Sequence, residues 1–529
     1  MRTSFEEVFS IDLRSLAVFR AALGGVLLVD LALRARDLVA HYTELGVLPR
    51  AAFAEHPIGW LVPWVSLHAH GPATVQVALF VLAAVCAGLL AVGFHARRAA
   101  FASWLLLVSL QNRNPLVSYG GDIVLVLLLF WSCFLPLGAR GSLDARRERS
   151  ADTARSCFSF GSAGLLVQIA ALHFFSALHK RGPEWIPDGS AIFYALHVDK
   201  FVRPLGELLR SHESLLRVLT WGSFGLELAG PLLLFLPWRF PALRLLAIAG
   251  FVAFHVGIGT TLDLVLFSWI SALAMTAFLP AWSWERAVPQ LAGRRTARPP
   301  GAAAASGAGS SSSLRISRGA NLAAAAALAF VLSWNTVTLR ADWQAAVEDD
   351  PVLQWAVFPG LLLRLGQTWS MFAPAPPKET KWHVVKGVLA DGREVDLLHG
   401  REAPPSFAKP ARRRDYYPSG RWERLFANAA ESDYVYAYPS LVHWYCARWN
   451  DDPGHATKLE RVAIFSRSER TLPGGARELG PPRLLARQRC AAAEPGAPPA
   501  DARRAPATGS SARTPATAQS TRIHASRAW

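Results

Sequence analysis

Residues 165–187 read LLVQIAALHFFSALHKRGPEWIP, and this stretch changes character at its middle. Its first part is apolar enough to enter a bilayer, yet it carries several polar side chains. At about 100° per residue, His173, Ser176 and Lys180 fall on one face of a helix. Gly182 and Pro183 then stop that helix. The stretch predicts a membrane helix with a polar seam that ends in an amine at the membrane boundary.

Composition places the chain among integral membrane proteins. Of its 529 residues, 52% are hydrophobic and 18% are charged, and the apolar residues are concentrated in long runs. The first run follows Glu6, Glu7 and Asp12, is longer than the core of a signal peptide and lacks a small-residue cleavage site. We therefore expect this run to remain as the first membrane helix.

Net charge and cysteine spacing argue against two other kinds of site. The formal net charge is +16, but the excess lies in loops beside apolar segments and in the C-terminal tail, so nucleic acid is not an expected partner. The five cysteines include no CxxC pair, and no His/Cys cluster has the spacing of metal ligands. The sequence therefore predicts no metal site.

Apolar segments long enough for helices predict an all-α polytopic membrane bundle of about nine transmembrane helices. The third segment is short for a hydrocarbon core of ~30 Å. The two segments that flank Thr260, Thr261 and Asp263 are either a tight hairpin or one broken helix. The segments lie near residues 14–34, 74–94, 98–112, 119–137, 160–179, 217–236, 243–260, 262–280 and 319–339.

The placement of arginines predicts the orientation of the chain. With the N-terminus in the cytoplasm, the cytoplasmic loops hold most arginines that lie near apolar segments, as the positive-inside rule requires. Nine spans then place the C-terminal region outside the cytoplasm. The exception is the loop after the fifth segment, and a functional site explains this exception better than topology does. That loop carries Lys180, Arg181, Lys200, Arg203, Arg210 and Arg217.

The chain divides into a membrane part and a small soluble part. Residues 1–285 form the multi-helix membrane domain, residues 286–318 a flexible cytoplasmic linker, and residues 319–340 the last transmembrane helix. Residues 341–470 predict a small extracytoplasmic α+β domain, because KWHVVKGVL and REVDLL flank a DG turn, RWERLFANAA is typical of a helix and LERVAIFSR of a strand. Residues 471–529 predict a disordered basic tail.

Several phrases of the membrane part occur in an order that resembles one family. They are IDLRSLAVFRAALGGVLLVDL, HYTELGVLPR, SLQNRNPLVSYGGD, FLPLGARGSLDA, the stretch around Lys180, LELAGPLLLFLPWRFPALR and FHVGIGTTLDLVLFSWISALAMTAFLP. Their order resembles the HTTM (horizontally transferred transmembrane) domain, the family of the vitamin K-dependent gamma-carboxylase and its bacterial relatives. QTWSMFAPAPPKETKWHVVKGVLADGREVDL is similar to the first soluble segment of bacterial members. The resemblance implies a multi-pass protein of a bacterial-type inner (plasma) membrane.

The resemblance also implies an activity. In the carboxylase, a lysine at the exit of a membrane helix deprotonates reduced vitamin K, oxygen then adds, and CO2 is fixed on a glutamate. Here Lys180 takes that position, with His179 before it and Glu184 and Trp185 after it. The FHVGIG run places His255 on a family histidine associated with oxygenation. The resemblance therefore implies a reduced vitamin K-type quinone, with oxygen and CO2 as co-substrates, and epoxidase or carboxylase (lyase) chemistry.

The chain departs from the carboxylase pattern in two places. Where the family has an Asn-His pair, before the helix that begins near Tyr119, this chain offers Arg113, Asn114 and Asp122 and no histidine. The soluble part is also much smaller than the region with which the carboxylase grips a peptide. We therefore favour quinone-linked chemistry on another substrate over peptide carboxylation. The expected substrate-binding residues are Glu227, His179, Trp185 and Asp122.

Each candidate residue also has a purely structural interpretation. Lys180 lies at the end of an apolar helix between His179 and Arg181, and both desolvation and nearby cations favour the neutral form that a base needs. Alternatively, it anchors the helix end among lipid headgroups. His255 either takes part in the chemistry or hydrogen-bonds a neighbouring helix. Glu227 is an ionisable group inside an apolar run and a candidate partner for a cation.

Two functions of different classes follow. The first is a membrane enzyme in which Lys180 is the general base, His255 and Glu227 are its polar partners, and the soluble domain guides a protein, peptide or smaller substrate. The second is a non-enzymatic protein of the same fold that handles lipid or assembles a partner. An enclosed aromatic cavity containing Lys180 favours the enzyme, whereas a lipid-exposed Lys180 favours the second function.

Overall fold

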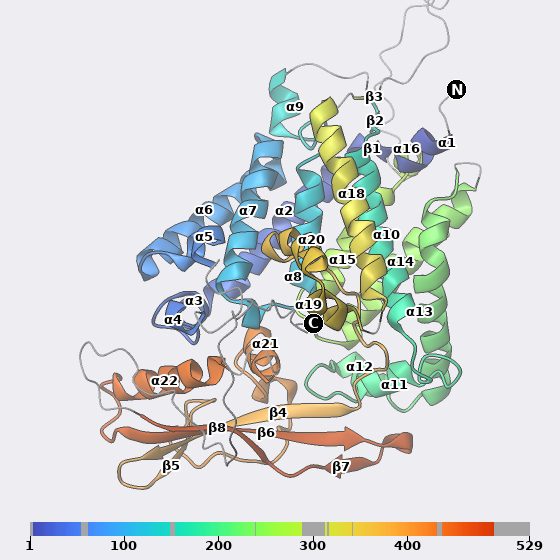
Figure 1. Cartoon of the computed structure of the whole chain (residues 1–529). Coiled ribbons are helices and arrows are strands. Elements are labelled where there is room, and N and C mark those ends of the chain that lie inside the picture. The colour runs from blue at the N-terminus through green and yellow to red at the C-terminus, as the bar shows by residue number, and fades with distance from the viewer. Residues whose placement is uncertain are drawn as a thin grey trace, which may run out of the picture.

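The structure is a computed structural model. It describes residues 4–53, 62–148, 154–237, 240–287, 313–314, 317–340, 342–430 and 436–490. Helices form the upper part of the molecule in Figure 1, and an antiparallel sheet lies across their lower end. Most of the expected linker (286–318) and the tail beyond residue 490 lie outside the described residues.

Five helices in the described part of the chain are long and apolar enough to cross a membrane. Each has at least 20 residues, and 20 residues at 1.5 Å per residue match a hydrocarbon core of ~30 Å. The protein is therefore embedded in a membrane. The five are α2 (Leu13–Ala35), α6 (Ala73–Val92), α10 (Phe160–His179), α14 (Pro241–Thr261) and α18 (Arg318–Thr338).

The remaining expected spans are helical but are shorter or more polar than a full span, so the count of nine is not confirmed. They are α7 (Ala96–Arg113), α8 (Gly120–Ser132), α13 (Glu213–Leu234) and α15 (Phe267–Ala274), the last of which continues into η4 (Met275–Phe278). The open question at Thr261 resolves as a hairpin, because a Cβ added at Gly259 would lie 3.1 Å from Trp269. Helices α14 and α15 therefore pack against each other.

One end of the bundle gathers the N-terminus and the loops expected in the cytoplasm (Figure 1). The ring of Phe9 lies 5.3 Å from that of Phe235, which joins the N-terminus to the turn after α13. The N–H groups of His95 and Ala96 donate to Asp144, which joins two further loops. The elements at this end are α1 (Ser4–Phe9), α9 (Leu143–Glu148), α16 (Ala281–Ala287) and a small sheet of β1 (Ile11–Asp12), β2 (Ser156–Cys157) and β3 (Ser313–Leu314).

The opposite end carries the loop after α10, with α11 (Ala191–Leu196) and α12 (Pro204–Leu209). Four of its six cations, which the sequence marked as an exception to the positive-inside rule, form ion pairs, three of them with carboxylates from outside the loop. This part of the loop therefore docks against the rest of the protein. The pairs are Lys180–Glu227, Lys200–Glu423, Arg203–Asp263 and Arg210–Asp199. Short helices at the same end of α2 and α6 are α3 (Leu38–Tyr42), α4 (Arg50–Phe53) and α5 (Val62–Val65).

The sequence predicted that a soluble domain starts at residue 341. In the structure, two further helices come before the sheet. After α18 the chain forms α19 (Trp343–Asp349) and then α20 (Pro351–Leu362), which turns back along α18 (Figure 1). A Cβ added at Gly360 would lie 2.6 Å from Trp334 of α18, so the two helices are in close contact. The composition of α20 is almost wholly apolar, which suits packing beside membrane helices. We name residues 363–378, which lead from α20 to the sheet, the return segment.

The soluble domain is a five-stranded antiparallel sheet covered by two helices. The predicted hairpin is β4 (Glu379–Leu389) with β5 (Glu394–Asp396), and the predicted third strand is β6 (Leu459–Thr471). RWERLFANAA forms α21 (Gly420–Ala429), and α22 (Ala437–Asn450) packs on β6. The sequence therefore predicted the central elements of this domain correctly.

The ordered fold continues past residue 470, so the predicted start of the disordered tail was wrong. β7 (Arg477–Leu479) and β8 (Arg483–Arg489) both pair with β6. A disulfide between Cys446 and Cys490 then joins the residue after β8 to α22. The arginine-rich composition suggested disorder, but β6 offers a long edge that satisfies the backbone of these strands.

Candidate functional site

The amine of Lys180 lies at the end of α10 and forms a buried ion pair with Glu227 of α13. Both side chains are only 5% exposed. Ser176, one turn earlier on α10, donates to the other oxygen of Glu227 at 3.3 Å. Lys180 is therefore not a lipid-exposed anchor. The seam of polar residues on α10 faces a carboxylate from a neighbouring helix.

The position of Glu227 follows from the sequence of α13. Pro231 lies four residues further on and has no N–H, so the carbonyl of Glu227 loses its usual helical donor. α13 packs against α10, and the buried side of α13 presents Glu227 to α10. The only favourable place for a carboxylate in such an apolar helix is beside a cation, which Lys180 supplies.

Trp185 covers the amine from the loop that follows α10. The Lys180 amine lies 4.3 Å from the centre of the Trp185 ring, which is a cation–π contact. The indole N–H donates to the carbonyl of Phe372 at 3.1 Å, and the N–H of Gly182 donates to the carbonyl of Pro374 at 2.7 Å. The return segment therefore holds the loop that covers Lys180.

Deeper in the bundle, His173 and His255 bring α10 and α14 together. Their Nε2 atoms are 3.5 Å apart, and the His173 ring stacks on Phe251 with centroids 4.2 Å apart. Both histidines are fully buried, and within the described residues neither Nδ1 atom has a hydrogen-bond partner. His173 lies seven residues before Lys180, or ~10 Å of helix rise. The histidine pair is therefore a second polar point on the same seam.

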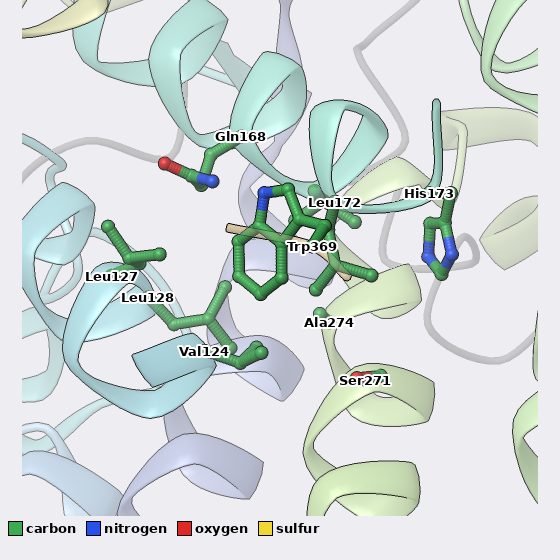
Figure 2. A pocket seen from close by; sticks show the side chains of 10 residues that line it. Val124, Leu127, Leu128, Gln168, Leu172, His173, Ser271, Ala274 and Trp369 are labelled. Carbon is green, nitrogen blue, oxygen red and sulfur yellow. The ribbon is translucent and has the colours of Figure 1, made fainter. Parts of the chain in front are cut away.

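A small internal pocket borders His173 (Figure 2). Trp369 of the return segment reaches into it, and its indole N–H donates to Gln367 at 3.0 Å. Gln367 in turn accepts from Gln168 of α10 at 2.7 Å. The amide pair fixes the return segment between helices near the middle of α10. The pocket is lined by Val124, Leu127, Leu128, Gln168, Ile169, Leu172, His173, Ser271, Ala274 and Trp369.

The membrane part matches a known family. A family model for the HTTM domain matches residues 9–284, which is more than half of the chain. The chain belongs to the HTTM family. The matched region contains Lys180, Glu227, His173 and His255, while the return segment and the soluble domain follow it. No curated protein and no solved structure matches the chain.

The sequence placed Asp122 among the substrate-binding residues, but Asp122 bonds to other residues than Lys180 does. Asp122 is fully buried and accepts hydrogen bonds from Arg34 of α2 and from Arg421 of α21. Asp30 accepts from the same two arginines, and the four residues form a buried ion cluster. The oxygens of Asp122 are therefore committed to two guanidinium groups.

Among the described residues, His179 forms no hydrogen bond with the Lys180 amine, and His255 lies on another helix. His179 directly precedes Lys180 and is half-buried, and its Nε2 atom has no partner among the described residues. His255 lies on α14 beside His173 rather than beside Lys180. The residues that the HTTM domain brings together around the amine are thus Ser176, Glu227 and Trp185.

Residues of the return segment were missed by sequence reasoning. Gln367, Trp369 and Phe372 lie outside the HTTM match, yet they contact the site inside it. The available signal was QTWSMF, whose three large apolar side chains are unusual for the start of a soluble domain. In the described part of the chain, no group of three or more His, Cys, Asp or Glu side chains could hold a metal ion.

Proposed function

We propose that this chain is a membrane enzyme in which Lys180 is a general base that acts on a reduced quinone in the presence of oxygen, as in the vitamin K-dependent carboxylase that the HTTM domain resembles. The observation that carries the proposal is the buried pair of Lys180 and Glu227 beneath Trp185. A lysine that only anchored the helix would keep its amine in water. Here the amine is dry and has a proton acceptor beside it.

The carboxylate of Glu227 gives Lys180 a route to its neutral form. Two charges buried away from water carry a large desolvation cost. When the ammonium of Lys180 gives a proton to Glu227, an N–H bond breaks, an O–H bond forms, and both groups become neutral. The free amine can then accept a proton from a substrate hydroxyl, while Ser176 holds the Glu227 side chain in place.

A reduced quinone would supply an acidic hydroxyl and a reducing ring at this site. Its polar groups fit two buried atoms of the residues next to Lys180 that have no partner in the described structure: Nε2 of His179 and Oε2 of Glu184. Trp185 offers a flat face for a ring. The Lys180 side chain is only 5% exposed, so a ring reaches its amine only when the Trp185 loop or the return segment moves. CO2 as a further co-substrate is part of the same proposal.

The proposal places the soluble domain outside the cytoplasm of a bacterial-type inner membrane. Disulfides persist in oxidising compartments, and Cys446–Cys490 lies in this domain. The loops rich in arginine lie at the opposite end, where the positive-inside rule expects the cytoplasm. Lys180 would then act near the extracytoplasmic face.

The test is turnover by the purified protein in detergent, supplied with reduced naphthoquinone and oxygen. We expect quinone epoxide from the wild type and from Lys381→Ala, the matched control, because the Lys381 side chain is 64% exposed and pairs with Glu379 on its own strand. Lys180→Ala should lose at least about a hundredfold in turnover, the usual contribution of a general base. Equal turnover in Lys180→Ala and the control would remove Lys180 from the mechanism.

The rival function, a non-enzymatic protein for lipid handling or partner assembly, is favoured by one observation. The pocket of Figure 2 does not include Lys180 among its lining residues. A protein that shows no quinone turnover, but binds a lipid or a partner equally well with Lys180→Ala, would support the rival.

A further inference from the structure

The outer half of the return segment, residues 371–378, lies against the Trp185 loop. Two of its carbonyls accept hydrogen bonds from that loop: Phe372 from the indole of Trp185 at 3.1 Å, and Pro374 from the N–H of Gly182 at 2.7 Å. A Cβ added at Gly182 would lie 2.9 Å from the carbonyl oxygen of Pro374, so the two segments already touch through their backbones. A substrate therefore passes between them only when they separate.

An ion pair is the third contact between the two segments. The amine of Lys378 lies 2.5 Å from Oε1 of Glu184 and 4.8 Å from the centre of the Tyr194 ring. The Lys378 side chain is 33% exposed, whereas that of Glu184 is only 9% exposed. Separation of the pair returns the amine to water, but it leaves a nearly buried carboxylate without its cation, which is unfavourable. The pair therefore favours the closed arrangement.

Lys378 belongs to the sheet rather than to the membrane bundle. Its carbonyl accepts from the N–H of Thr471 at 2.8 Å, which extends the pairing of β4 with β6 by one residue. The match to the HTTM family ends before this residue, at position 284. The soluble domain therefore reaches the Trp185 loop through the side chain of Lys378.

The backbone of Phe372 is strained in the closed arrangement. Its φ is 57°, in the left-handed region, where a bulky side chain crowds the backbone. Such a conformation is unfavourable and persists only when neighbouring contacts hold it. One contact that holds it is the hydrogen bond from the Trp185 indole. Phe372 can relax once the two segments part, so the strain favours release of the outer half, while Gln367 and Trp369 keep the inner half among the helices.

We propose that Lys378 is a positioning residue of the Lys180 site. It holds the Trp185 loop closed over the amine, and the site admits its substrate when the ion pair with Glu184 opens. The identity of that substrate, a reduced quinone, rests on the proposed function, whereas the closure does not. The closed loop keeps water from the amine during the chemical step. Because Lys378 is part of the sheet, the position of the soluble domain controls access to the site.

The first test is hydrogen exchange of the full chain in detergent, which needs no turnover. The N–H of Gly182 is followed by mass spectrometry, since it is bonded across the closure. In Lys378→Met it should exchange about tenfold faster than in the wild type, because a hydrogen bond to a charged group shifts an equilibrium by about this factor or more. Lys378→Arg keeps the cation and should keep the protection.

Lys386→Met is the matched control for hydrogen exchange. Lys386 also lies on β4, pairs with Glu394 at 2.5 Å and is 27% exposed, but it is part of the hairpin with β5. Its variant should protect Gly182 like the wild type. Equal exchange at Gly182 in Lys378→Met and Lys386→Met would overturn the proposal. Exchange that rises equally throughout β4 and β6 would also overturn it, because the sheet rather than the closure would then have loosened.

The second test separates KM from kcat for reduced naphthoquinone. If only the open form admits the quinone, a tenfold larger open population in Lys378→Met should lower KM by about tenfold. kcat should not rise, because the chemical step takes place under the closed loop. An unchanged KM in a variant with faster exchange would overturn the control of access by Lys378. If exchange responds as expected but no protein turns over the quinone, the proposed function fails and the closure by Lys378 stands.

Discussion

Arg421 of the soluble domain donates two hydrogen bonds to Asp122 of the membrane bundle, at 3.0 and 3.1 Å. The same guanidinium reaches Asp30 at 2.6 Å, and Arg34 bonds both carboxylates from the other side. All four side chains are at most 4% exposed. Because the two acids and two arginines balance in charge, α21 and the bundle are joined by a complete buried ion cluster.

Removal of Arg421 should therefore weaken the attachment of the soluble domain. Arg421→Met leaves two buried carboxylates facing one arginine, and breaking a buried ion pair in this way costs about 3–5 kcal/mol. Thermal unfolding in detergent and limited proteolysis should both show an earlier loss of the soluble domain. Arg414→Met, whose side chain is 72% exposed, is the control and should unfold like the wild type. Equal protease resistance of the two variants would contradict a structural role for the cluster.

A double variant separates the structural role of the Lys180–Glu227 pair from its chemical role. Glu227→Ala alone leaves a buried ammonium without its carboxylate and should cost about 3–5 kcal/mol. Replacing both residues by Met removes both charges and fills similar space, so most of that stability should return. Turnover should be absent from the stable double variant. Wild-type turnover by a well-folded double variant would show that the pair is only structural.

The sequence predicted the membrane helices well because their signal is local. A run of apolar residues long enough to cross a bilayer, such as Leu13–Ala35, indicates a transmembrane helix without knowledge of its neighbours. The short helices were harder to judge. α8 and α15 have only 13 and 8 residues, and they are buried by longer neighbours rather than by lipid. Length alone therefore overstates the number of full spans.

The site was predictable only in part because its contacts join distant positions. Lys180 and Glu227 were each recognised as ionisable groups in apolar helices, but 47 residues separate them and nothing local reports that they pair. Gln168 and Gln367 are 199 residues apart. Asp122 was assigned to the substrate by its place beside a family motif, whereas the structure commits it to arginines that lie 88 and 299 residues away. Helix packing decides which of these residues pair, and the packing cannot be recognised from local patterns in a single sequence.

Acidification should destabilise the soluble domain through His383. This residue of β4 is buried, stacks on Phe426 at 4.9 Å and lies 2.7 Å from the hydroxyl of Tyr417. Burial, followed by the charge of Lys200, lowers the pKa of His383 from 6.5 to about 3. The unfolded chain therefore binds a proton that the folded chain does not. The contribution of neutral, buried His383 to the free energy of unfolding is fully present above pH 6.5. It falls as the pH drops from 6.5 towards 3, and about 2 kcal/mol of it is lost at pH 5.

The measurement for His383 compares unfolding of the wild type and His383→Phe between pH 7 and pH 5. Other groups, including Glu423 and Asp199, also have lowered pKa values because lysines and arginines outweigh their burial, and they lose stability in acid in both proteins. The difference between the two curves therefore reports His383 together with its charge interaction with Glu423. Parallel curves for the two proteins would show that the histidine does not titrate on unfolding.

Reduction of the Cys446–Cys490 disulfide should release the last strand of the soluble domain. The bond closes a loop with a sequence separation of 44 residues. By lowering the entropy of the unfolded chain, a disulfide across such a loop stabilises the fold by about 4 kcal/mol. We expect a lower unfolding temperature of the soluble domain with a reducing agent, and in Cys446→Ser without one. Cys133→Ser, at a free cysteine of the membrane bundle, is the control. In Cys446→Ser, a membrane-impermeant thiol reagent should label Cys490 on intact cells whose outer membrane admits the reagent, because the proposed orientation puts the domain outside the cytoplasm. Labelling only after the inner membrane is opened would place the domain in the cytoplasm, where such a disulfide does not persist.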